Sequence, residues 1–114
     1  MAKSSYIPQM PGEKLLLKAL VLYVSNNPGY LDSERNTNTL LCILRDNHAP
    51  QKLDALFGAA SRTPKLFDAC NTYDKFRNEA SDNLMVNILF TMMTALADPT
   101  LTLGELYCIA ESEV

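Results

Sequence analysis

The chain has 114 residues, 47% of them hydrophobic, and this composition predicts one folded domain and excludes an intrinsically disordered chain. The longest apolar run, residues 84–97, is shorter than the roughly 20 residues of a membrane-spanning helix and includes Asn87, so no membrane span is expected. The net charge is −3, and the charges are unevenly distributed along the chain. All ten Lys and Arg residues lie in 1–77, and residues 78–114 carry only acids. This distribution predicts either a basic partner for the acidic end or ordinary solvated faces.

The first half of the chain predicts an arm followed by two helices. Residues 1–10 contain Pro8, precede Pro11 and show no periodic pattern, so we expect a flexible N-terminal arm, and residues 11–114 are predicted to form a single helical domain. Residues 12–25 predict the first helix, with Pro11 at its first position. The apolar group at 40–44 predicts a second helix whose first turns are exposed.

Residues 50–80 predict a pair of helices. Pro50 is typical of a helix start, and residues 51–57 predict a short helix that Gly58 ends. Thr63 is a predicted N-cap, and Pro64 is the predicted first residue of the next helix. Residues 64–80 show the spacing of an amphipathic helix.

The segment 81–98 is the most apolar in the chain, with its polar residues in one narrow strip, so we expect it to be the central helix. Ser81 is the predicted N-cap and Pro99 the predicted stop, while Thr102 and Glu105 form a capping box that opens a last helix. The sequence therefore predicts an all-α fold, a compact bundle of about five to six helices around a central apolar helix 81–98. Whether 64–80 and 81–98 are separate helices stays open.

Few residues could carry chemistry. His48 is the only histidine, and no cysteine has a neighbour at the spacing of a metal site, so we expect no metal and no cofactor. We predict that the protein is not an enzyme; a pair of His48 with a cysteine is a remote alternative. From the polar, proline-containing start we expect no secretory signal. Cys42, Cys70 and Cys108 lie among apolar residues, which predicts reduced, buried thiols in a cytoplasmic protein.

The main functional prediction is a surface that binds a partner protein. The segment 81–98 carries adaptable apolar side chains of the kind found at permissive binding surfaces, namely Met85, Met92, Met93 and Phe90. The same spacing is typical of a core, but two nearly all-apolar helices are difficult to cover in a chain of this size. We therefore predict a regulatory or adaptor protein that binds another protein, as a homodimer, by analogy with small bacterial or phage accessory proteins.

The alternative is a DNA-binding regulator. Residues 51–80 resemble a helix-turn-helix in outline, and four basic residues could approach phosphates, namely Arg62, Lys65, Lys75 and Arg77. Against this, the connection 58–63 is longer than the usual turn, and Asp68 and Asp74 would repel a nucleic acid. A plain helical hairpin explains the same pattern.

Overall fold

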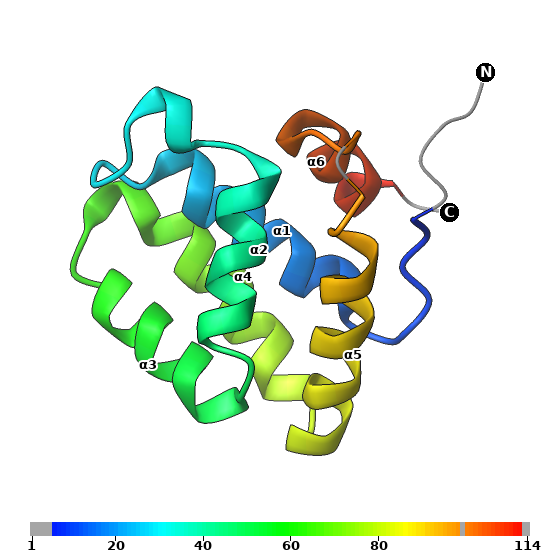
Figure 1. Cartoon of the computed structure of the whole chain (residues 1–114). Coiled ribbons are helices and arrows are strands. Elements are labelled where there is room, and N and C mark those ends of the chain that lie inside the picture. The colour runs from blue at the N-terminus through cyan, green and yellow to red at the C-terminus, as the bar shows by residue number, and fades with distance from the viewer. Residues whose placement is uncertain (1–5, 99, 113–114) are drawn as a thin grey trace.

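The computed structural model describes residues 6–98 and 100–112 (Figure 1). Within them the chain forms six α-helices and no β-strand, so the predicted all-α bundle is confirmed. The helices are α1 Glu13–Asn26, α2 Thr37–Asp46, α3 Pro50–Ala60, α4 Phe67–Glu79, α5 Asp82–Ala95 and α6 Leu103–Glu111. Two short 3-10 helices, Asp32–Glu34 and Pro64–Leu66, precede α2 and α4.

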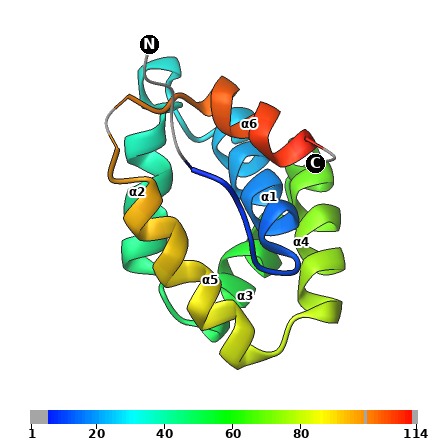
Figure 2. The same ribbon diagram turned by 90° about the vertical axis from the view of Figure 1, so that its right-hand side faces the viewer.

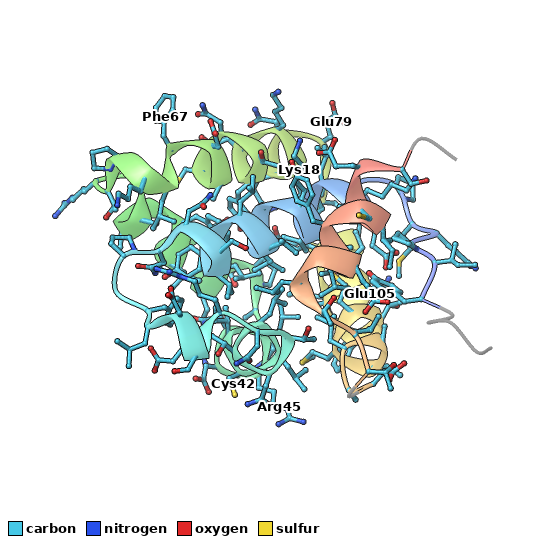
Figure 3. The ribbon with its side chains drawn as sticks, turned by 90° about the horizontal axis from the view of Figure 1, so that it is seen from above. Lys18, Cys42, Arg45, Phe67, Glu79 and Glu105 are labelled. Atoms are coloured by element: carbon cyan, nitrogen blue, oxygen red, sulfur yellow. The ribbon has the colours of Figure 1, made fainter. Side chains whose placement is uncertain are left out.

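The helix that the others surround is α1. Its most extensive contacts are with α4 and α6, and it crosses the middle of the molecule with α4 on one side and α2 on the other (Figure 3). Eight of the 14 residues of α1 are buried, against four of the 14 in α5. The centre of the bundle is therefore α1 rather than the predicted 81–98, because the polar side of α5, with Asn87 and Thr91, stays in solvent.

Two predicted helix starts have the expected caps. The Ser81 hydroxyl accepts the N–H of Leu84 at 3.1 Å, and the Thr102 hydroxyl accepts the N–H of Glu105 at 3.1 Å. The Glu105 carboxylate in turn accepts the N–H of Thr102 at 3.1 Å, which completes the capping box. At the start of α2 the Asn36 side chain accepts the N–H of Thr39 at 3.0 Å and caps the helix.

The helix boundaries at two glycines differ from the prediction. Gly12, and not Pro11, directly precedes α1, and its φ of 82° lies in the left-handed region. A Cβ at Gly12 would also lie only 3.1 Å from Cδ1 of Phe76. Gly58, by contrast, has an ordinary backbone, so α3 continues through it to Ala60 instead of ending there.

The segments 64–80 and 81–98 are separate helices. Ala80 is extended, with φ −108° and ψ 125°, and it separates α4 from α5. The guanidinium of Arg77 donates to the Ala80 carbonyl oxygen at 3.0 Å, and this bond stabilises the connection between α4 and α5.

The described part of the N-terminal arm, residues 6–10, lies against the bundle beside α5 (Figure 2). Its contacts converge on Glu13, which is fully buried. The Tyr6 hydroxyl donates to Glu13 Oε2 at 2.7 Å, and the N–H groups of Gln9 and Met10 donate to Oε1, each at 3.1 Å. Burial and the Glu13 carboxylate together raise the pKa of Tyr6. The predicted flexibility of the arm stays a prediction, and residues 1–5 lie outside the described residues.

Candidate partner-binding surfaces

The structure separates the four predicted contact residues of α5. Met85 and Met92 are fully buried in the core, so they are not on a surface that a partner could reach. Met93 is half-buried and packs against the core, whereas the Phe90 side chain is 62% exposed. The physical reason is helical spacing: Met85 and Met92 lie two turns apart on the side that carries Ile88 and Leu89, and Phe90 lies off that side.

Val86, Phe90 and Met93 form an apolar row along one flank of α5, which we call the Phe90 strip. Their spacings of four and three residues place the side chains next to one another, with Val86 and Met93 half-buried and Phe90 exposed. Beside the strip, the exposed Thr91 and Thr94 donate their hydroxyl protons to backbone carbonyls of their own helix, at 3.0 and 3.1 Å. The strip is therefore an apolar surface bordered by small polar groups.

Other large apolar side chains are exposed singly on different elements. Phe67 at the start of α4 is 62% exposed and points away from the fold (Figure 3). Leu31 lies in the segment before α2, and Ile7 in the N-terminal arm. Singly exposed apolar residues are common on protein surfaces, so Phe67 and Leu31 need no functional explanation.

A groove of about 660 Å³ lies between the N-terminal arm and α5. Its lining residues are Tyr6, Ile7, Gln9, Met10, Glu13, Thr91, Thr94, Ala95 and Asp98. The backbone N–H of Thr100 and its hydroxyl both donate to Asp98, at 2.9 and 2.7 Å, and these bonds lower the pKa of Asp98. The volume is within the range of small-molecule binding pockets.

Arg77, one of the four predicted phosphate-contacting residues, forms ion pairs within the fold. Its guanidinium pairs with Asp54 at 2.9 Å and with Asp82 at 2.5 Å, and these bonds raise its pKa. Tyr73 donates to the same Asp54 oxygen at 2.5 Å and stacks on Phe57 with 4.2 Å between ring centroids. Arg77 thus joins α3, α4 and α5.

The other three basic residues are exposed. The structure gives Arg62, Lys65 and Lys75 no ion pair within the described residues. Arg62 and Lys65 lie at the connection between α3 and α4, while Lys75 shares the exposed side of α4 with acids that include Asp68 and Asp74. Two of the four therefore gather at one corner, and α4, which would be the recognition helix, carries three acids against two bases.

No hydrogen bond joins His48 to a cysteine within the described residues. The exposed His48 ring places Nδ1 3.0 Å from the Arg45 carbonyl oxygen. Cys70 is buried and its thiol donates to the Phe57 carbonyl oxygen at 3.4 Å; burial raises its pKa. Cys42 is exposed, on the outer side of α2 beside Arg45 (Figure 3), and so is Cys108, so the prediction of three buried thiols is wrong for two of them. Within residues 6–98 and 100–112 no group of three His, Cys, Asp or Glu side chains could hold a metal.

Comparisons of the chain with protein families, curated proteins and solved structures gave no match. None of the helices described here is long and apolar enough to span a membrane. Two features of the surfaces were missed from the sequence, the groove and the contribution of Val86. The spacing of Val86 four residues before Phe90 was a signal that could have found it.

Proposed function

We propose that this chain is a non-enzymatic regulatory or adaptor protein of the cytoplasm that acts by binding another protein through the Phe90 strip. The observation that supports this is the 62% exposure of Phe90 between the half-buried Val86 and Met93. Burying an aromatic side chain fully is worth roughly 1.5–3 kcal/mol, so covering Phe90 with a partner would be favourable by a large part of that amount.

The form of the strip fits contact with a helix or a flat apolar surface. Aromatic side chains are enriched among residues that dominate binding energy, and they work best when surrounded by groups that exclude water. Val86 and Met93 supply the apolar surround, and the threonines along α5 supply a polar border whose hydroxyls already have partners. The chemistry is therefore that of an interface with one aromatic anchor.

A homodimer is part of the proposal. In a two-fold contact the same surface meets itself, and two Phe90 strips would cover each other. A different protein could occupy the same strip, and the measured mass of the free protein separates these two cases.

The test compares two equally exposed phenylalanines. Phe90→Ser and Phe67→Ser remove side chains that are both 62% exposed, one inside the strip and one on α4. We expect both variants to unfold within about 0.5 kcal/mol of the parent. Light scattering gives the oligomeric state of each, and a partner identified by mass after affinity capture is purified and titrated against each.

Phe90→Ser should convert a dimer to a monomer, or weaken binding of the purified partner at least about tenfold, equivalent to 1.4 kcal/mol. Phe67→Ser should do neither. If the parent chain is monomeric and its purified partners bind Phe90→Ser as tightly as the parent, the proposal is overturned.

The DNA-binding alternative has one supporting observation, the exposed pair Arg62 and Lys65 at the corner between α3 and α4. Filter binding to mixed-sequence duplex DNA at several salt concentrations tests it, because phosphate contacts make affinity fall steeply with salt. Reversing both charges, Arg62→Glu with Lys65→Glu, should abolish that binding. DNA affinity unchanged by the double reversal would eliminate the alternative.

A further inference from the structure

The groove between the N-terminal arm and α5 lies next to the Phe90 strip, on the side of α5 that carries Thr91 and Thr94. Tyr6, Ile7, Gln9 and Met10 of the arm line one side, and Thr91, Thr94 and Ala95 line the other. The arm is held in position by the three hydrogen bonds to Glu13, so this wall is fixed by specific contacts within the fold.

The electrostatic character of the groove is negative. Its two acidic lining residues are Glu13, which is fully buried, and Asp98, which is half-buried. None of the nine lining residues is a lysine or an arginine. Asp98 accepts two hydrogen bonds from Thr100, which lower its pKa further below neutral pH. A cation would be attracted to this groove and a phosphate repelled from it.

The groove also carries apolar surface. Ile7 is 68% exposed at its rim, and Met10 and Ala95 are half-buried in its walls. An occupant that covers Ile7 must therefore supply an apolar side chain as well as a positive charge. A segment of a protein that combines lysine or arginine with leucine-like side chains meets both requirements.

We propose that this groove binds an extended basic segment of a partner protein, with a lysine or arginine side chain beside Asp98 and an apolar side chain against Ile7 and Met10. The inference rests on the proposed function, since it names a second contact with a protein partner. Nucleic acid is the less favourable occupant, because its phosphates would lie near the Asp98 carboxylate and meet no lysine or arginine among the lining residues.

The test uses a short, fluorescein-labelled peptide of alternating lysine and leucine, with a glutamate–leucine peptide of equal length as the charge control. Fluorescence anisotropy measures binding of each peptide to the full chain. Backbone amide shifts in NMR spectra then locate the contact, which should fall on residues 6–10 and 91–98.

The variant Thr94→Lys places a positive charge in the groove at an exposed position of α5. Its matched control is Asn71→Lys on α4, which makes the same change in net charge at an exposed position outside the groove. We expect Thr94→Lys to weaken binding of the lysine–leucine peptide at least about tenfold and Asn71→Lys to change it less than about twofold. Phe90→Ser should leave peptide binding intact.

The outcomes separate this inference from the proposed function. Absence of saturable binding, equal binding of the glutamate–leucine peptide, or equal loss in Thr94→Lys and Asn71→Lys overturns the groove proposal. It does so whether or not Phe90→Ser abolishes partner binding. If the peptide binds as expected and Phe90→Ser keeps both its oligomeric state and its partner, the groove proposal stands and the Phe90 strip is rejected.

Discussion

Replacing Gly58 and Gly12 with alanine should change the free energy of unfolding in opposite directions. Gly58 has helical backbone within α3, and no heavy atom lies within 4 Å of the position that a Cβ would take. Alanine is favoured over glycine by about 0.8–1 kcal/mol inside a helix. Because Gly58 lies near the end of α3, we expect Gly58→Ala to raise the free energy of unfolding by about 0.5–1 kcal/mol.

At Gly12 the same substitution should destabilise the protein. A side chain at a left-handed position costs roughly 1–2 kcal/mol, and the φ of Gly12 is 82°. The added Cβ would also lie 3.1 Å from the Phe76 ring, which must shift. We therefore expect Gly12→Ala to lower the free energy of unfolding by about 1–3 kcal/mol.

Urea denaturation followed by circular dichroism measures both changes, and thermal unfolding provides a second measurement. For a domain of this size, 1 kcal/mol corresponds to a shift in Tm of about 4 °C. A loss of stability in Gly58→Ala would show that α3 ends at Gly58. A neutral effect of Gly12→Ala would show that residue 12 is not left-handed. Either result would refute the corresponding backbone assignment.

Three further predictions concern titration, an ion pair and the thiols. Burial and the Asp54 carboxylate raise the pKa of Tyr73, so the folded protein keeps this phenol protonated while the unfolded chain loses the proton above about pH 10. The free energy of unfolding should therefore fall as pH rises above about 10, and Tyr73→Phe should reduce that fall in pH-dependent urea titrations. A double-mutant cycle with Asp54→Asn and Arg77→Met should give a coupling of about 0.5–1 kcal/mol that decreases in high salt; zero coupling would contradict the observed pair. Cys42 and Cys108 should react quickly with an aromatic disulfide reagent and Cys70 only on unfolding, and a single fast thiol per chain would contradict this.

Much of the helical framework could be predicted from the sequence, because its signals are local. Ser81 and Thr102 cap their helices as expected, and Pro50 is the first residue of α3. The centre of the bundle could not be predicted in this way. Apolar content favoured 81–98, but which helix the others cover depends on tertiary packing, and they cover α1.

The two candidate surfaces also differ in how far local sequence signals predict them. Helical spacing alone could have separated Phe90 from Met85 and Met92, because Phe90 lies nearer to the polar side of α5 that carries Asn87. The groove had no such signal. It exists because the Glu13 carboxylate holds the arm in place beside α5, and no periodicity in the sequence records that contact.

The central place of α1 also bears on the order in which the chain can fold. Residues 27–66 separate α1 from α4, and α6 begins only at Leu103, so the two main contacts of α1 are both distant in sequence. During synthesis α1 is made before the other helices, yet its apolar sides stay uncovered until α4 and α6 have followed. Folding should therefore be slower than in a helical bundle whose neighbours in sequence pack together, and chains interrupted before α6 should expose the apolar surface of α1 and aggregate.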